Sequence, residues 1–260
     1  DHSSLACIDR LATSKAKLVA KQDCIICGVD IARMVFELVD DKLQFQAFAS
    51  DGQKIKKGDI VFKVEGSAIS ILTAERTLLN YMQRLSGIAT TTSEYVNLIA
   101  GTSARLLDTR KTTPTMRILE KYAVKTGGGT NHRIGLFDMI MLKDNHIDFA
   151  GGIEKAIDRT LQYLKDKQLD LKIEIEVRNF EELQRVLAKG GVNRIMLDNF
   201  SVEDTQKAVK MIDHKYEIES SGGITAENIL SYAQTGVDFI SVGALTHQIK
   251  SIDLSLLAED

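Results

Sequence analysis

The 260-residue sequence has few cysteines, and their number excludes a protein stabilised by a disulfide framework. It contains three, Cys7, Cys24 and Cys27, and an odd count in a long chain favours reducing conditions. Cys24 and Cys27 have a spacing found in metal and redox sites, but the residues between them are apolar and no second cysteine pair follows. We therefore predict that both are buried small hydrophobic residues.

Long apolar runs and a large charge of one sign are also missing. No run approaches the roughly 18–20 apolar residues that span a bilayer, and the N-terminus lacks a basic segment followed by an apolar stretch. The 33 basic and 36 acidic side chains give a net charge of −3, so no overall field favours nucleic acid or membrane. These absences predict a cytoplasmic protein with no nucleic-acid or membrane partner, in which any anion site is local.

The first 70 residues have the pattern of a small α/β domain. Strand-like runs are expected at 17–21, 43–49 and 60–64, with a helical stretch at 31–38. Apolar residues then recur at helical spacing over 69–85, and a second helix is expected at 88–99. We expect these two helices to join the small domain to the rest of the chain.

After residue 101, short apolar runs alternate with amphipathic segments of helix length, which is typical of repeated βα units. The six expected strands are 104–107, 139–142, 173–175, 194–197, 217–218 and 238–242. The expected helices are 114–125, 152–165, 180–188, 202–212 and 226–234. Pro114, the only proline, stands where a first helical turn tolerates it. Six repeats fit a barrel or a doubly wound open sheet, and periodicity does not separate the two.

Basic side chains gather around the first two of these strand ends, where parallel α/β folds form their binding sites. They are Arg110, Lys111, His132, Arg133 and Lys143. Arginine binds carboxylates with two parallel hydrogen bonds, whereas lysine supplies a point charge. The mixture predicts a site for a planar dicarboxylate, or for a phosphate beside a carboxylate.

Acidic and glycine-rich segments follow the later strands. Glu176 and Asp198 can hold ribose hydroxyls, share Mg²⁺ with a pyrophosphate and stabilise positive charge on a sugar carbon. Glu174 shares a strand face with Glu176 and is interpreted as a supporting residue. Free N–H groups at helix starts bind phosphate. Such cradles are expected at Ser221, Gly222, Gly223, Gly243 and Ala244.

Several motifs together make the sequence resemble the quinolinate phosphoribosyltransferase family. They occupy residues 75–80, 83–90, 108–114, 120–124, 127–133, 143–146, 197–200, 219–223 and 242–247. The match is dense from Glu75 to the C-terminus and loose over the first 70 residues. It departs at Thr115 and Met116, where the family commonly has glycine and a bulky apolar residue.

The resemblance implies a fold, a reaction and an assembly. The expected α/β fold has an N-terminal α/β sandwich domain at 1–86 and an open, incomplete TIM-like α/β barrel at 87–247, with 248–260 packing back on the first domain. The expected reaction transfers phosphoribosyl from phosphoribosyl pyrophosphate to quinolinate with decarboxylation, giving nicotinate mononucleotide, carbon dioxide and pyrophosphate in de novo NAD biosynthesis. Mg²⁺ and a homodimer, in which Arg76 of one subunit completes the neighbour's site, are also implied.

The resemblance further implies roles for individual residues. The expected quinolinate ligands are Arg76, Thr109, Arg110, Lys111, His132, Arg133 and Lys143. The expected phosphoribosyl pyrophosphate ligands are Glu176, Asp198, Ser221, Gly222, Gly223, Gly243 and Ala244. Lys111, Lys143, Glu176 and Asp198 are expected to be catalytic, and the two acids to meet the metal, directly or through water.

Other functions stay compatible with the residues alone. Lys143 could form a Schiff base in a lyase, and His132, His146, Glu176 and Asp198 could serve a metal-dependent hydrolase, although the histidines lack a compact ligand motif. A paralogue associated with molybdenum transport shares the 108–114 stretch, whereas 143–146 favours the quinolinate enzyme. A catalytically inactive anion-binding barrel would be expected to lack the acids that are present here.

Overall fold

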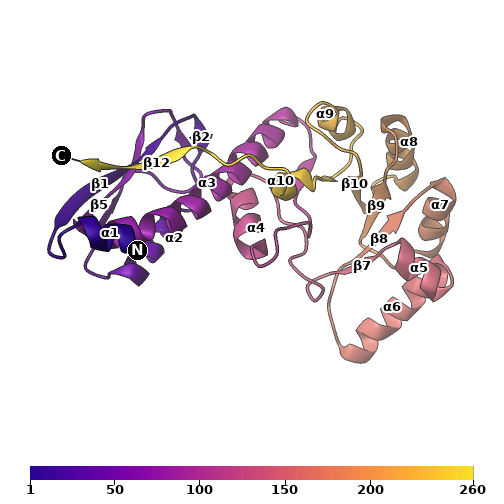
Figure 1. Ribbon diagram of the computed structural model, residues 1–260. Helices are drawn as coiled ribbons and strands as arrows, with labels where there is room; N and C mark the ends of the chain where they lie inside the picture. The colour runs from indigo at the N-terminus through magenta and orange to yellow at the C-terminus, as the bar shows by residue number, and fades with distance from the viewer. Residues whose placement is uncertain (260) are drawn as a thin grey trace. The chain divides into compact units, whose positions relative to one another are not determined.

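The computed structural model describes residues 1–259, and the chain forms two compact units (Figure 1). Over the described residues, the first unit contains 1–94, 113–128 and 245–259. The second contains Tyr95–Thr112 and Gly129–Ala244. Over the described residues, no helix has both the length and the apolar character to cross a membrane.

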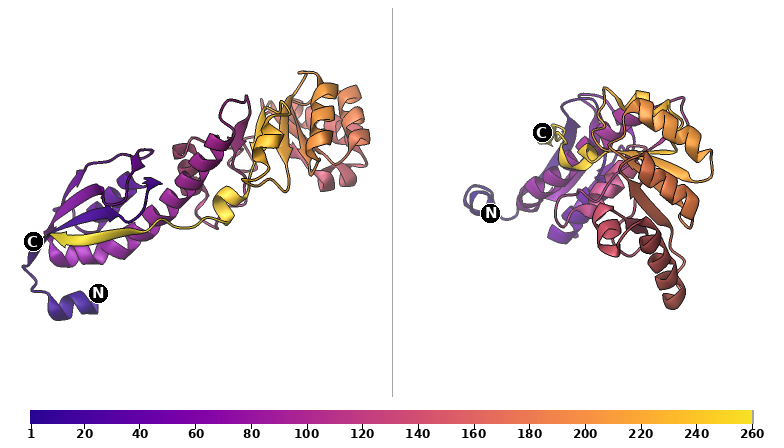
Figure 2. Two further views of the ribbon diagram at one scale, coloured as in Figure 1. Left: turned by 90° about the horizontal axis from the view of Figure 1, so that it is seen from above. Right: turned by 90° about the vertical axis from the view of Figure 1, so that its right-hand side faces the viewer.

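A four-stranded antiparallel sheet, in the order β12-β1-β5-β3, forms the first unit together with its helices. The strands are β1 (Thr13–Ala20), β3 (Gln44–Ala47), β5 (Ile60–Ser67) and β12 (Leu254–Glu259). β12 comes from the far end of the chain and pairs along most of β1, from Ala20 with Leu254 to Lys15 with Glu259 (Figure 2). Two short strands, β2 (Cys24–Ile25) and β4 (Lys54–Ile55), pair separately.

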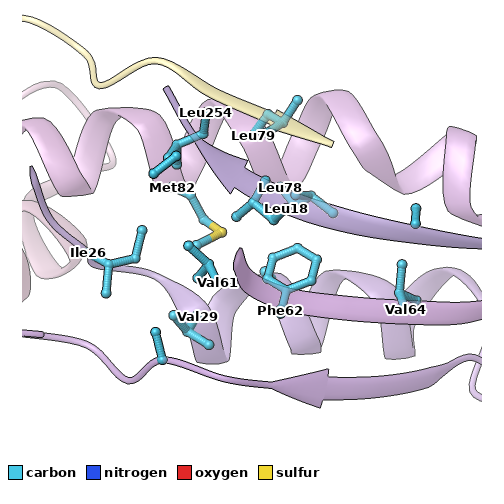
Figure 3. Close-up of a cluster of buried hydrophobic side chains, with 14 of the residues drawn as sticks. Leu18, Ile26, Val29, Val61, Phe62, Val64, Leu78, Leu79, Met82 and Leu254 are labelled. Atoms are coloured by element: carbon cyan, nitrogen blue, oxygen red, sulfur yellow. The ribbon is translucent and has the colours of Figure 1, made fainter. Parts of the chain in front are cut away.

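The core of the first unit lies between this sheet and the helices α2 (Val29–Val39) and α3 (Ala68–Leu98). β1 buries alternate residues, as a strand with one face on a core does. Figure 3 shows Leu18 from β1, Phe62 from β5 and Met82 from α3 pointing toward one another. The ring of Phe62 also packs edge to face against that of Phe36 on α2, with 5.9 Å between the ring centroids. A short helix, α1 (His2–Cys7), precedes the sheet.

α3 is one continuous helix, so the expectation of two helices at 69–85 and 88–99 was wrong. Gly87 lies between the two expected helices, but its φ is not in the left-handed region and it stays helical. A Cβ at Gly87 would lie 2.5 Å from the Lys250 carbonyl oxygen. Glycine is therefore needed here for close packing against another segment, and not for a turn.

The second unit contains a six-stranded parallel sheet in the order β6-β11-β10-β9-β8-β7. Its strands are β6 (Arg105–Leu107), β7 (Ile140–Leu142), β8 (Ile173–Val177), β9 (Arg194–Asp198), β10 (Glu217–Ser221) and β11 (Phe239–Ser241). The edge strands β6 and β7 do not pair with each other in the described chain, so the barrel is open. The predicted fold class, an N-terminal α/β domain with an open, incomplete α/β barrel, is confirmed.

Helices alternate with these strands. They are α5 (Asp144–Ala150), α6 (Ile153–Lys167), α7 (Phe180–Lys189), α8 (Val202–Ile212) and α9 (Ile229–Ala233). α4 (Arg117–Thr126) lies in the first unit, and α10 (Ala244–His247) begins at the last residue of the second unit and continues into the first. In the left view of Figure 2, α6, α7 and α8 lie together on one side of the sheet. The helix expected at 202–212 has the bounds of α8, and α5 was not anticipated.

Two expected helix starts were wrong. α4 begins at Arg117, and Pro114 lies before it instead of in its first turn. Thr115, with φ of 67°, separates the two because a left-handed residue cannot continue a right-handed helix. α9 begins at Ile229, three residues later than expected. A turn stabilised by the Asn228 side chain, which accepts a hydrogen bond from the Thr225 N–H at 2.8 Å, precedes it.

Candidate active site

The inner face of the parallel sheet is polar. In the paired rows of a parallel sheet, neighbouring side chains point to the same side. Glu174, Arg194 and Glu217 form one row, Glu176, Met196 and Glu219 the next, and Asp198 and Ser221 a third. The alternate residues of β8, Ile173, Ile175 and Val177, are buried on the opposite face. The sequence therefore combines an apolar outer face with a charged inner face.

The acids expected to follow strands lie within them. β8 continues past Glu176 to Val177, and β9 includes Asp198. A charged residue suggests the end of a strand when an apolar core is assumed on both faces, but here the inner face accepts charge. Glu176 is buried, and its Oε2 is 3.0 Å from Nζ of the exposed Lys143. Lys143 precedes α5, and its backbone N–H donates to Nδ1 of His146 at 3.0 Å.

The glycine-rich turn after β10 packs directly on the end of β9. Asn199 donates from Nδ2 to Asp198 at 2.8 Å, and its backbone N–H donates to the Ser221 carbonyl oxygen at 2.8 Å. Gly222 has φ of 94°, and a Cβ there would lie 2.2 Å from Asn199 Oδ1. Only glycine fits this position without displacing Asn199.

The expected pair of helix-start cradles is only half correct. Gly222 and Gly223 are separated from α9 by the turn at Thr225, so the first cradle is not at a helix start. Gly243 immediately precedes α10, which begins at Ala244 and has four residues. Any anion held after β10 must therefore be bound mainly by backbone and side-chain donors of the turn.

Two arginines on neighbouring segments lack acidic partners. Burial, and then the nearby charge of Arg110, lowers the pKa of Arg133. Across residues 1–259 neither guanidinium is in an ion pair, and Nε of Arg110 is buried without a hydrogen-bond partner. Arg133 Nη1 donates to the Met139 carbonyl oxygen at 3.2 Å. Two close cations, one with an unsatisfied buried donor, form a site that a carboxylate would complete.

His132 reaches back from the same segment into the inner face of the sheet. Its Nε2 is 2.9 Å from Oε2 of Glu174 and 3.4 Å from Oε2 of Glu219. Burial opposes the charged ring, but the two neighbouring carboxylates outweigh it and raise the pKa of His132 to about 9. A hydrogen bond from the Arg133 N–H to Nδ1, at 2.6 Å, requires the neutral ring and works against this rise. Nε2 lies within 3.4 Å of both acids, but these contacts do not have hydrogen-bond geometry.

A metal ion does not fit the His132 cluster. His132, Glu174 and Glu219 are the only His, Cys, Asp and Glu side chains of the described chain that gather closely enough to hold one. Nη1 of Arg194, however, is 3.1 Å from Glu219 and 4.0 Å from Glu174, so a cation of the protein is already there. The hydrolase set of His132, His146, Glu176 and Asp198 is not among the groups that lie close enough to hold a metal in the described part of the chain.

Arg194 was missed by the sequence interpretation. Its guanidinium contacts Glu217 at 3.1 Å and Glu219 at 3.1 Å, and it stacks 3.9 Å from the ring centroid of Phe239. The signal that could have found it is the alternation of acidic with apolar residues at 173–177 and 217–219. That period of two indicates a strand with one charged face.

The structure thus brings most predicted site residues to one unit. All lie in the second unit except Arg76, which is exposed on α3 in the first. Arg76 has no ion pair with any residue of the described chain. Thr109 accepts a hydrogen bond from the Lys111 N–H at 3.0 Å, which shapes the loop after β6.

An open parallel barrel with an unpaired arginine pair beside buried acids defines an anion-binding α/β protein. Two family models match the chain: quinolinate phosphoribosyl transferase, N-terminal domain, over residues 1–86, and its C-terminal domain over residues 88–257. The chain belongs to the quinolinate phosphoribosyltransferase family. The resemblance predicted from the motifs is confirmed.

Relatives and solved structures agree with this assignment. "Quinolinate phosphoribosyltransferase [decarboxylating] 2b, mitochondrial" of Nicotiana tabacum is 45% identical over 257 residues, which cover 94% of this chain and 73% of the relative. "Nicotinate-nucleotide pyrophosphorylase [carboxylating], chloroplastic" of Arabidopsis thaliana is 46% identical over 256 residues, covering 93% and 73%. The structure of the nicotinate-nucleotide pyrophosphorylase from Francisella tularensis has a TM-score of 0.94 at 44% identity, covering 100% of this chain and 90% of that one.

Proposed function

We propose that this chain transfers the phosphoribosyl group of phosphoribosyl pyrophosphate to quinolinate and releases carbon dioxide and pyrophosphate, as its family's name describes. The product is nicotinate mononucleotide, an intermediate of de novo NAD biosynthesis. The observation that carries the proposal is the unpaired Arg110–Arg133 pair with its unsatisfied buried Nε. A planar dianion with adjacent carboxylates supplies the acceptors that this pair lacks.

Quinolinate is proposed to bind at this arginine pair. The surrounding ligands are Thr109, Arg110, Lys111, His132, Arg133 and Lys143, with Arg76 from a second subunit. The two guanidinium groups can each bind a carboxylate with two hydrogen bonds, whereas the lysines add point charges. This arrangement leaves the pyridine nitrogen available for reaction.

Phosphoribosyl pyrophosphate is proposed to bind along the ends of β8 to β11. Glu176 and Asp198 would face the ribose, while Ser221, Gly222, Gly223, Gly243 and Ala244 would cradle the 5-phosphate. Support comes from the register that pairs Asp198 with Ser221 and from the close approach of Gly222 to Asn199. The turn thereby lies beside the proposed ribose site, as a ribose 5-phosphate requires.

Mg²⁺ is the proposed metal, carried mainly by the pyrophosphate. The carboxylates of Glu176 and Asp198 are the hard oxygen donors that it prefers, directly or through water. The ammonium of Lys143 already occupies one Glu176 oxygen, which fits a metal held chiefly by substrate and water. When bound, the ion would neutralise charge on the leaving pyrophosphate.

The mechanism needs no nucleophile from the protein. The pyridine nitrogen forms a bond to the anomeric carbon while the bond to pyrophosphate breaks, and Glu176 and Asp198 stabilise the positive charge that develops on the sugar. The ring nitrogen is then cationic. When the 2-carboxylate leaves as carbon dioxide, its bonding electron pair stays on ring carbon 2, is stabilised by that cation and takes up a proton.

A single assay tests the proposed function. Purified protein with quinolinate, phosphoribosyl pyrophosphate and Mg²⁺ is expected to form nicotinate mononucleotide, which chromatography detects. Nicotinate lacks one carboxylate and should bind with at least about 2–3 kcal/mol less free energy, because one charge-assisted set of contacts is lost. Absence of product, or equal affinity for the two acids, would contradict the proposal.

The proposed location is the cytoplasm, and the proposed assembly is a homodimer. Cys24 and Cys27 are buried and free, which suits a reducing compartment. The exposed and unpaired Arg76 supports a partner that supplies its counter-charge. Cell fractionation tests the first, and light scattering of the purified protein tests the second.

A further inference from the structure

A chain of contacts connects the centre of the sheet to the proposed quinolinate site. It begins at Arg194 on β9, which binds Glu219 at 3.1 Å and lies 4.0 Å from Glu174. These two carboxylates lie 3.4 and 2.9 Å from Nε2 of His132. All four side chains are buried. A buried charge network of this kind fixes its members because a displaced charge would lose its partners without gaining water.

The ring of His132 is in turn attached to the backbone of Arg133. Nδ1 accepts the Arg133 N–H at 2.6 Å, while the His132 N–H donates to Oδ1 of the buried Asp108 at 2.7 Å. Nε2 toward the acids and Nδ1 toward Arg133 leave the ring one orientation. The position of Arg133 relative to Arg110 therefore depends, through His132, on Glu174, Glu219 and Arg194, which are not among the proposed quinolinate ligands.

We propose that Arg194 is a positioning residue for quinolinate binding, acting through Glu219 and Glu174 on His132 and thereby on Arg133. The inference rests on the proposed function, because it concerns the site where quinolinate would bind. Arg194 itself is held rigidly from a second side, by Glu217 at 3.1 Å and by the Phe239 ring at 3.9 Å. Its fixed guanidinium therefore keeps the carboxylates of Glu219 and Glu174 in place.

The alternative is that Arg194 only stabilises the fold. A purely structural residue would weaken quinolinate binding equally whether or not His132 is present. A positioning residue that acts through His132 loses its effect when His132 is removed. Double-mutant cycles separate the two cases, since residues of one network are non-additive.

The test measures quinolinate affinity by calorimetry for Arg194→Met, His132→Ala and the double variant. Arg194→Met should weaken binding about tenfold, or ~1.4 kcal/mol, in the presence of His132 and less than about twofold in the His132→Ala background. The difference is a coupling of at least about fivefold, or ~1 kcal/mol. Arg185→Met is the matched control, because Arg185 forms an exposed ion pair with Glu154 outside the network. Its affinity should equal that of the wild type.

Glu219→Gln keeps the shape of the side chain and removes its charge. Combined with His132→Ala, it gives a second double-mutant cycle in case Arg194→Met does not fold. The same loss of effect in the His132→Ala background is expected. Additive losses in a protein whose wild type binds quinolinate would overturn the role of Arg194 alone. A wild type that does not bind quinolinate would overturn the proposed function and this inference together.

Discussion

At the scale of single residues, the second unit uses charge in two ways. Arg194 is buried and satisfied by acids on its own sheet, whereas Arg110 keeps a buried donor unsatisfied. The paired Arg194 fixes the positions of its neighbours, and the unsatisfied Arg110 attracts an anion. Glu176 lies between the two cases, because it is buried on the inner face yet pairs with the exposed Lys143.

The first prediction concerns Glu176→Ala and Asp198→Ala. Both variants should lower turnover about 100-fold or more and leave quinolinate affinity mostly intact, because their proposed role is to stabilise charge on the sugar. Steady-state kinetics and calorimetry measure the two quantities. Glu154→Ala, an acid in an exposed ion pair on α6, is the control. Loss of quinolinate binding with normal turnover at saturation would show that the roles are wrongly assigned.

The second prediction concerns the cysteines, whose interpretation as buried hydrophobic residues is confirmed. Burial raises the pKa of Cys24 from 9.0 to about 11 and that of Cys27 to about 12. Between pH 9 and about 11, both thiols stay protonated in the native state and ionise in the unfolded state. Stability from this source is therefore complete below pH 9 and is lost as the pH rises toward 11.

Thiol labelling and alkaline denaturation check this. At pH 8 the native protein should react with a thiol reagent at the exposed Cys7 only, and at three positions after unfolding. The denaturant midpoint of the wild type should fall between pH 9 and 10.5, and less steeply in Cys27→Ala. Rapid labelling of two or three thiols in the native protein would contradict the burial.

At the scale of secondary-structure elements, glycine and its absence decide where helices continue or begin. Gly87 allows α3 to run unbroken beside the Lys250 carbonyl. Thr115 occupies a left-handed conformation, with φ of 67°, just before α4. The family resemblance commonly places glycine at that position. The conformation gives a physical reason, because a β-branched residue is strained there.

The third prediction follows from that strain. Thr115→Gly should stabilise the protein by about 0.5–1 kcal/mol, since relief of a left-handed threonine exceeds the entropic cost of glycine. The melting temperature should rise by about 1–3 °C in calorimetry. Thr73→Gly on the exposed face of α3 is the control and should destabilise by about 0.5–1 kcal/mol. A fall in both variants would mean that Thr115 is not strained.

At the scale of the whole molecule, the chain crosses between its two units several times. Segments from its start, middle and end form the first unit, and β12, near the C-terminus, pairs with β1 at the edge of the sheet. Arg76 lies in this unit, while every other predicted ligand lies in the second. The proposed role of Arg76 therefore depends on the formation of a dimer.

The fourth prediction tests that assembly by subunit mixing. Arg76→Ala and Lys143→Ala should each be inactive alone. In a mixed two-fold dimer both changes fall in one site and the other site is intact. Random exchange should thus restore up to about a quarter of wild-type activity. No recovery after exchange verified by mass spectrometry would show that Arg76 serves its own chain or no site.

The sequence by itself determined the family, the βα order and the ends of the strands at which the ligands lie. These features are local: apolar runs, helical spacing and short motifs such as residues 108–114 are readable without knowing what packs against them. The positions of Arg110 and Lys143 after strands follow from the same patterns, whereas Glu176 and Asp198 lie within β8 and β9.

The tertiary structure alone decided which face of the sheet each side chain joins and what it meets. Arg194 and Glu219 are 25 positions apart and come together only because β9 and β10 pair in one register. The same holds for Gly87, whose need for glycine comes from Lys250, a residue far along the chain. Contacts between distant segments depend on pairing and packing energies summed over the whole fold, and no local pattern records them.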